Sequence, residues 1–166
     1  MRFMEIRHAQ KKDLPELMQI YADARLFMKE HGNAHQWEDH YPSLETITED
    51  IDQQQSYVCI ENDQIIGTFV FFIREDPTYQ TIQGKWSSAK TYGVIHRIAG
   101  KAQAKGIAKA CFKYCFEQID YVRIDTHEDN LPMQNVLKKY GFCPCGTIYL
   151  ENGDPRLAFD CLKQSL

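Results

Sequence analysis

One stretch, residues 95–119, constrains the fold most, because it predicts a strand, a tight basic turn and a helix in direct succession. From residue 107 onward, apolar residues recur at steps of four, which is the spacing of one helix face. These residues are Ile107, Cys111, Cys115 and Ile119, flanked by Ala108, Phe112 and Phe116. A helix with so broad an apolar face packs on a sheet, so the stretch predicts a mixed α/β fold.

The turn between this strand and this helix has the properties of an anion site. Gly106 stands where the chain enters the helix, and its missing side chain lets a ligand approach the backbone. The first N–H groups of a helix have no partner within it, and the helix dipole adds partial positive charge there. Lys101, Lys105 and Lys109 add further charge. The turn therefore predicts a site for a phosphate or a pyrophosphate.

Two common phosphate motifs do not fit these residues. A Walker loop requires Gly-Lys-Ser/Thr, whereas Gly106 is followed by Ile107 and Ala108. A dinucleotide fingerprint requires three closely spaced glycines, and the stretch contains only Gly100 and Gly106. The pattern that does fit is Gln/Arg-x-x-Gly-x-Gly/Ala, which begins at Gln103.

This pattern resembles the acetyl-coenzyme A loop of the GNAT superfamily of N-acetyltransferases. A second block, residues 130–142, resembles the other signature of the family, an Asn and a helix followed by Gly-Phe. The resemblance extends over most of the chain. It implies one N-acetyltransferase domain over residues 1–166 with the GNAT fold. In that α/β fold, three layers surround a mostly antiparallel sheet of six to seven strands, whose fourth and fifth strands are parallel and splayed apart.

The resemblance also implies where acetyl-coenzyme A would bind. In the family its pantetheine arm lies between the splayed strands, which makes Ile98 its backbone partner and places Asn130 on its far side. The residues around the pyrophosphate would be Gln103, Ala104, Lys105, Gly106, Ile107 and Ala108. The alternative is an ordinary strand-to-helix turn with exposed lysines. The joint occurrence of both signatures favours the cofactor site.

The implied reaction is transfer of an acetyl group from a thioester to a primary amine by direct attack in a ternary complex. It requires a neutral amine and a proton for the leaving thiolate. The tyrosine that many relatives place seven residues after the Asn falls on Leu137, which donates nothing. Tyr140 is a candidate acid on the same helix, although a core tyrosine is the simpler interpretation. Water as the acid, or a thiolate that leaves unprotonated, are the other routes.

Three residues are candidates for the general base. His96 lies on the strand beside the thioester, and His127 lies at the end of the neighbouring strand. Neutral imidazole titrates in the useful pH range, but either ring is also compatible with a structural hydrogen bond. Glu38, acting through a water molecule, is the third candidate.

The irregular segment 33–42 is the expected border of the acceptor pocket, with Trp37, Glu38 and Tyr41 as candidate substrate contacts. The alternative is that Trp37 and Tyr41 close the core under a long connection. The acceptor could be a small molecule, an amino acid or a peptide, and Glu38 with Asp39 would suit a cationic amine. A non-catalytic coenzyme A binding module, and a transferase that uses another acyl-coenzyme A, are alternative functions.

Composition limits the partners. A formal net charge of -4 argues against nucleic acid. No apolar run is long enough for a membrane span, and residues 1–6 lack a secretory leader, so we expect a cytoplasmic protein. The six cysteines are expected to be reduced; Cys143 and Cys145 lack zinc-site spacing and are expected to pack in the core, so we expect no metal. By family analogy, the exposed strands allow a homodimer.

Local patterns predict the remaining elements. They are strands at 3–8, 56–60, 64–73 and 121–127, helices at 13–31 and from residues 43 and 130, a surface loop or short hairpin extension at 74–88, a strand from residue 92, and a closing hairpin of 142–150 with 156–162.

Overall fold

Eight strands form one sheet in the computed structural model, which describes residues 4–163. The sheet order is β1-β2-β3-β5-β6-β8-β7-β4, and every neighbouring pair is antiparallel except β5 and β6. The strands are β1 (Glu5–His8), β2 (Ser56–Glu61), β3 (Gln64–Ile73), β4 (Gln83–Gly84), β5 (Gly93–Gly100), β6 (Tyr121–Thr126), β7 (Cys143–Tyr149) and β8 (Pro155–Leu162). The count exceeds the expected six to seven because the short β4 is added at one edge.

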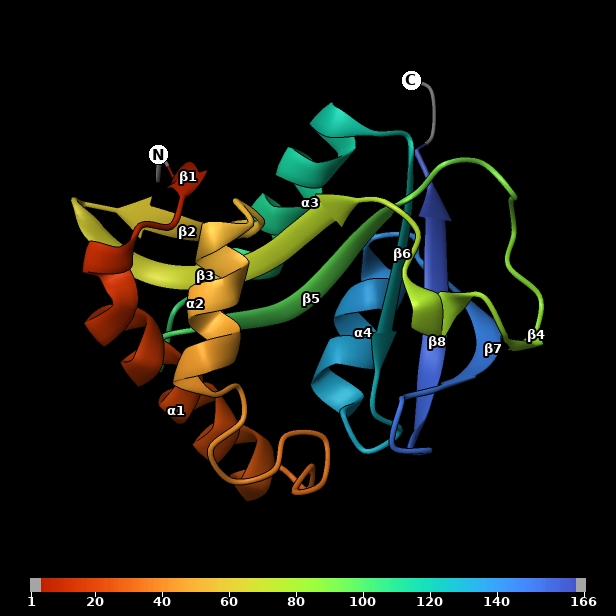
Figure 1. Cartoon of the computed structure of the whole chain (residues 1–166), viewed down its shortest axis with the longest axis horizontal. Coiled ribbons are helices and arrows are strands. Elements are labelled where there is room, and N and C mark those ends of the chain that lie inside the picture. The colour runs from red at the N-terminus through yellow and green to blue at the C-terminus, as the bar shows by residue number, and fades with distance from the viewer. Residues whose placement is uncertain (1–3, 164–166) are drawn as a thin grey trace.

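Helices cover both faces of this sheet (Figure 1). They are α1 (Leu14–Glu30), α2 (Leu44–Asp52), α3 (Ile107–Gln118) and α4 (Leu131–Lys139), with short 3-10 turns η1 (Lys11–Asp13) and η2 (Pro77–Tyr79). One buried cluster joins α1 and α2 to the sheet through Leu17, Ile20, Ile47 and Val58. A second cluster joins α3 and α4 to the opposite face. The expected three layers, and the helices and strands that define them, are therefore confirmed. Residue 3, where the first strand was expected to begin, lies outside the described residues.

A glycine allows α3 to pack closely on the sheet. A Cβ atom at Gly67 would lie 2.4 Å from Cδ1 of Ile107, so no larger residue fits there without a shift of the helix. Ile107 is buried at the first position of α3. The apolar face that predicted the helix is thus anchored directly over β3, which fixes where the preceding turn lies.

The segment between β3 and β5 differs from the expected surface loop. It crosses the second half of the sheet and adds β4 to the far edge, beside β7 (Figure 1). Tyr79 is 1% exposed and packs in a third cluster with Tyr92, Tyr121 and Ile148. Most of the segment is irregular and exposed, as expected of a loop, but its aromatic side chains bury themselves against β6, β7 and β8, although the segment has no regular apolar period.

The sheet opens between β5 and β6, as expected for splayed parallel strands. Their pairing covers only residues 93–95 and 122–124, after which the two strands separate. On its other side β5 contains a bulge opposite β3, where Arg97 has a φ of +52°. The bulge turns β5 away from β6. The polar backbone edges of both strands therefore face a gap.

All six cysteines are free thiols, and Cys59, Cys111 and Cys115 are buried. Cys143 is exposed, so core packing was the wrong expectation for it; the outward face of β7 carries its side chain into solvent. Among residues 4–163, no helix has both the length and the apolar character needed to cross a membrane.

Candidate active site

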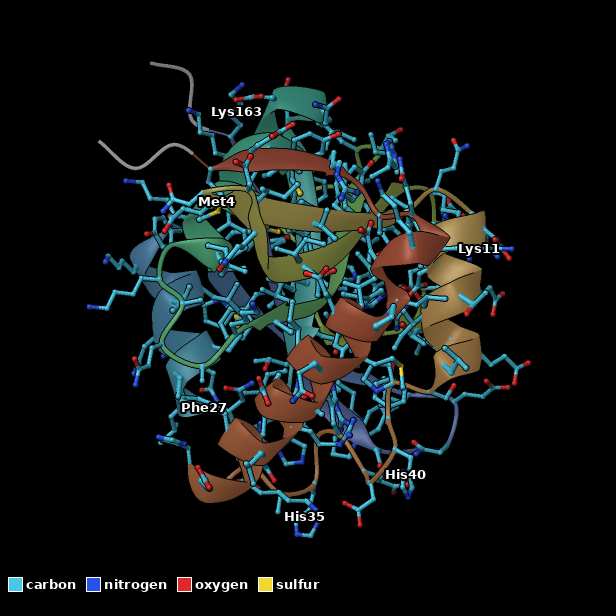
Figure 2. The ribbon with its side chains drawn as sticks, turned by 90° about the vertical axis from the view of Figure 1, so that its left-hand side faces the viewer. Met4, Lys11, Phe27, His35, His40 and Lys163 are labelled. Atoms are coloured by element: carbon cyan, nitrogen blue, oxygen red, sulfur yellow. The ribbon has the colours of Figure 1, made fainter. Side chains whose placement is uncertain are left out.

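A cavity of about 340 Å³ opens where β5 and β6 separate. Its walls come from the loop after α1, the start of η2, the ends of β5 and β6, and the turn between β7 and β8. Figure 2 looks onto the α1 side of the molecule, where His35 and His40 mark that loop beyond the end of α1. The charged and titratable lining residues are His35, Glu38, Asp76, His96, Arg97, Asp125, Asp154 and Arg156, with Tyr41 beside them.

His96 is held by a carboxylate in this cavity. Its Nε2 lies 2.8 Å from Oδ2 of Asp76, and Oδ1 of Asp76 accepts hydrogen bonds from N (2.9 Å) and Oγ1 (2.7 Å) of Thr78. Burial raises the pKa of the Asp76 carboxyl, but the hydrogen bonds from His96 and Thr78 outweigh it and lower the pKa to about 2. An ionised carboxylate only accepts hydrogen bonds, so Nε2 is the donor. In the neutral ring the lone pair is then on Nδ1.

A second carboxylate lies near that lone pair. Nδ1 of His96 is 4.0 Å from Oδ2 of Asp125, which is too long for a direct hydrogen bond. The same oxygen accepts a hydrogen bond of 2.6 Å from the hydroxyl of Tyr79. Burial and the charge of Asp125 raise the pKa of Tyr79 well above its ordinary value, so it stays a neutral donor. Two carboxylates thus flank His96, one in hydrogen-bond contact and the other 4.0 Å away.

His127 is placed differently. It follows β6, and its Nδ1 accepts a hydrogen bond of 3.0 Å from the backbone N–H of Asp129. It does not line the cavity. The structure therefore gives this ring a role in the turn that leads into α4.

The three expected substrate contacts all line the cavity. Trp37 is 7% exposed and packs edge-on against Tyr21 and Tyr41, so it closes the core and forms a cavity wall at once. Glu38 is exposed at the rim. The hydroxyl of Tyr41 accepts a hydrogen bond of 3.1 Å from Arg97.

The turn before α3 has the conformation of an anion site. Gln103 and Gly106 have φ values of +66° and +83°, in the left-handed region. Ala110 makes the first helical hydrogen bond, to the Gly106 carbonyl at 3.0 Å. The N–H groups of residues 106–109 consequently have no acceptor within the helix. Gln103, Lys105 and Gly106 are exposed beside them, whereas the side chain of Ile107 points into the core and Ala104 and Ala108 are half-buried.

The other expected cofactor contacts lie at the gap between β5 and β6. Ile98 lines the cavity from β5. Asn130 caps α4 by accepting from N of Met133 at 3.1 Å, and its amide donates to Gln36 in the loop after α1 at 2.9 Å. Thr126 is 1% exposed in the cavity wall, and its hydroxyl has no hydrogen-bond partner among residues 4–163. A bound ligand or a water molecule would satisfy this hydroxyl.

The helix after Asn130 presents no acid to the cavity. Leu137, at the position where many relatives have tyrosine, is fully buried in the core. Tyr140 lies at the end of α4, where its ring packs edge-on against Phe112 at 5.6 Å between centroids. It does not line the cavity. Packing is therefore the role that the contacts of Tyr140 support.

Sequence reasoning missed Asp76, Asp125, Tyr79 and Arg156 as parts of the site. One signal was present for Asp125, since β6 places it and Arg123, two charged residues, in a mostly buried strand. Asp76 and Tyr79 had none, because their contacts to His96 and Asp125 span 20 and 46 residues. No group of three or more His, Cys, Asp or Glu side chains suited to a metal ion occurs among residues 4–163.

Comparison with known proteins gives consistent results. Residues 4–143 match a family model described as "Acetyltransferase (GNAT) domain". The L-amino acid N-acetyltransferase AaaT of Escherichia coli (strain K12) is 26% identical over 162 residues, which cover 90% of each chain. The peptidyl-lysine N-acetyltransferase YiaC of the same organism is 23% identical over 137 residues and 82% of each chain. A crystal structure of a GNAT family acetyltransferase from Streptococcus agalactiae 2603 superposes with a TM-score of 0.87 at 30% identity, covering 98% of this chain and 96% of that one.

Proposed function

Because this chain belongs to the GNAT superfamily and is an acyltransferase, we propose that it transfers an acetyl group from acetyl-coenzyme A to a primary amine by direct attack in a ternary complex. The observation that carries the proposal is the pair of His96 and Asp76, 2.8 Å apart, in a cavity at the opening between β5 and β6. Such a pair provides an oriented base where an amine would meet the thioester.

The residues around the opening fit acetyl-coenzyme A. The unpaired N–H groups of residues 106–109, with Lys101, Lys105 and Lys109 nearby, suit its pyrophosphate. Gln103, Ala104, Ile107 and Ala108 complete that turn. The free edge of β5 at Ile98 and the unpartnered hydroxyl of Thr126 suit the amide groups of its arm, and Asn130 lies beside them. When bound, acetyl-coenzyme A supplies a thioester whose acyl carbon accepts the amine.

In this proposal, His96 accepts one proton from the acceptor amine, and Asp76 orients the ring for that transfer. Asp76 keeps the proton on Nε2 of His96, which leaves Nδ1 to take a proton from the incoming ammonium group. The resulting imidazolium lies between Asp76 and Asp125, and both charges stabilise it. The neutral amine that remains is the nucleophile, and the second proton that its nitrogen loses on forming the amide passes to water or to the departing thiolate.

We assign no side-chain acid to α4. Leu137 has no proton to give, and Tyr140 packs against Phe112 away from the cavity. A thiol has a pKa of about 8.5, so a thiolate leaving group is tolerated near neutral pH. Positioning and the base therefore account for the reaction in this proposal.

The test is an acetyl-transfer assay with an amine panel that includes amino acids and lysine peptides, read by release of free coenzyme A. His96→Ala is expected to lower kcat/KM by about 10²- to 10⁴-fold, the usual contribution of a general base. His127→Ala is the matched control and is expected to change kcat/KM less than threefold, since its ring serves a turn. Unchanged turnover in His96→Ala would refute the assignment of the base.

The same assay decides between the donors. The assay is repeated with propionyl- and succinyl-coenzyme A as donors for the same amines. Acetyl-coenzyme A is expected to give the highest kcat/KM of the three donors. If no donor reacts with any amine, although acetyl-coenzyme A raises the melting temperature, the chain binds coenzyme A without turnover and the proposed function fails.

A further inference from the structure

One buried cation in the cavity wall lacks a counter-charge. Arg156, on β8, is 6% exposed and lines the cavity. Its guanidinium donates to two backbone carbonyls, Pro155 O at 2.8 Å and Gln36 O at 3.1 Å. It forms no ion pair with any carboxylate of residues 4–163. A guanidinium has five N–H donors, so three of them have no recorded partner.

Three other arginines of the described residues have a carboxylate or aromatic partner. Arg97 forms a bidentate pair with Asp50, and Arg7 pairs with Asp13. Arg123, which is equally buried, lies over the rings of Tyr92 and Trp86. Arg156 has neither a carboxylate nor a ring. A buried charge without compensation is unfavourable, which indicates that a ligand supplies the anion.

The nearest acidic side chain in this wall does not supply it. Asp154 precedes β8 and lines the same cavity, but its carboxylate accepts from the side chain of Asn152 within its own turn, at 3.3 Å. It is exposed to solvent. The free donors of Arg156 are therefore available to the cavity.

Arg156 and His96 lie across the cavity from each other. Strand β6 separates their strands; its Asp125 pairs with Ala158, and Arg156 follows the same face of β8 two residues away. Two paired-strand spacings amount to roughly 10 Å, and the separation of β5 from β6 beyond residue 95 widens this distance, part of which the long Arg156 side chain spans. One wall thus presents the pair of Asp76 and His96, and the other presents the guanidinium of Arg156.

We propose that the acceptor is a free amino acid, whose carboxylate binds Arg156 while its amine faces His96. This inference rests on the proposed function and names its substrate class. The charges of the two walls complement those of a zwitterion. A lysine within a peptide is flanked by neutral amide bonds and would leave Arg156 without an anion, so the cavity discriminates against it.

The first experiment uses the unaltered protein with acetyl-coenzyme A and matched pairs of acceptors. The pairs are L-alanine, L-methionine, L-phenylalanine and L-lysine, each against its carboxamide, with a lysine peptide as a further acceptor. For the amino acids that react, kcat/KM is expected to be about 10- to 100-fold higher for the acid than for the amide. The amide has the less basic amine and so is more often neutral, which makes this preference contrary to intrinsic reactivity.

The outcomes separate the two proposals. Amides or the lysine peptide acetylated as well as the acids would overturn the amino acid acceptor and leave the transferase function standing. If the protein acetylates none of these amines and no other primary amine, both the proposed function and the proposed acceptor are overturned.

Variants test the residue itself. Arg156→Gln is expected to raise KM for the amino acid about 10- to 100-fold while KM for the amide changes little, so the preference disappears. Arg156→Lys keeps the positive charge and is expected to retain part of the preference for the acid over the amide. Arg7→Gln, at the opposite edge of the sheet, is the matched control and leaves the preference intact. An equal loss for acid and amide in Arg156→Gln, in protein that acetyl-coenzyme A still stabilises, would overturn the assignment.

Discussion

Arg97 and Asp50 form a bidentate ion pair that ties the bulge of β5 to α2. Nε of Arg97 lies 3.0 Å from Oδ2 of Asp50, and Nη2 lies 2.7 Å from Oδ1. Asp50 is 3% exposed and also accepts a hydrogen bond of 2.8 Å from Gln55. Arg97 has a left-handed φ of +52°, which few residues adopt without external support. The pair therefore holds the backbone where the sheet opens.

Removing one partner of this pair should destabilise the protein strongly. Asp50→Asn leaves the Arg97 guanidinium buried without its counter-charge, and we expect the free energy of unfolding to fall by about 3–5 kcal/mol. The double variant Asp50→Asn/Arg97→Gln removes the uncompensated charge, so it should lose less than the sum of the single variants. Urea unfolding of all three proteins measures both effects.

Asp52→Asn is the control on the same helix. Asp52 lies 3.5 Å from Nζ of Lys11, and the side chains are 55% and 67% exposed, so this surface pair should contribute less than about 1 kcal/mol. Comparable losses in Asp50→Asn and Asp52→Asn would show that the buried pair does not hold the bulge.

Substitution of Gly106 tests whether the turn before α3 binds acetyl-coenzyme A. Gly106→Glu places a carboxylate where we propose the pyrophosphate, and the expected result is loss of ligand stabilisation. In the unaltered protein that stabilisation should be about 2.7 kcal/mol at a ligand concentration 100 times its Kd. Thermal melting with acetyl-coenzyme A, coenzyme A and ATP measures it.

Gly106→Ala separates charge from backbone strain. A Cβ there meets only Cε of Met4, at 3.9 Å, so the methyl group fits, although the φ of +83° costs about 1 kcal/mol in a non-glycine residue. We expect this variant to melt lower yet keep the shift with acetyl-coenzyme A. If Gly106→Glu retains the full shift in melting temperature with acetyl-coenzyme A, the cofactor does not bind at this turn.

The fold could be predicted where the determining contacts are local. The period of Ile107 and Cys111 indicated α3, and the local patterns of residues 56–60 and 64–73 indicated β2 and β3; all three elements occur in the structure. The close approach of α3 to β3 at Gly67 accompanies this local pattern, because Ile107 begins the helix directly over that glycine. Short-range periodicity was sufficient for these elements because their own side chains form the buried faces.

The site was harder to predict because long-range contacts build it. The strand position of His96 was enough to nominate it, but its partner Asp76 lies in a segment with no apolar period. That segment is held by the burial of Tyr79, and no local pattern shows that a polar stretch will fold across a sheet. The exposed Cys143 was misassigned for a related reason, since alternation along a strand does not reveal which face is covered.

Acid pH should remove the contribution of Asp76 to stability. The pKa of Asp76 is lowered from 3.8 to about 2 in the folded protein, where the hydrogen bonds from His96 and Thr78 outweigh burial. The folded state therefore binds the proton less readily than the unfolded chain. The contribution is complete above about pH 4 to 5 and declines as the pH falls toward 2. Urea unfolding of the protein and of Asp76→Asn between pH 2 and 7 should show a gap that is constant at neutral pH and narrows below about pH 4.

His96→Gln tests whether the imidazole causes the lowered pKa. Nε2 of His96 donates to Asp76 at 2.8 Å, and this hydrogen bond lowers the pKa of Asp76 more than that from Thr78 does, whereas glutamine provides at most a weaker neutral donor. In the His96→Gln background, the gap opened by Asp76→Asn should be smaller at pH 5 and should vary less toward pH 2. If the gap has the same size and slope in both backgrounds, Thr78 and not His96 holds the carboxylate, and Asp76 would not orient the base.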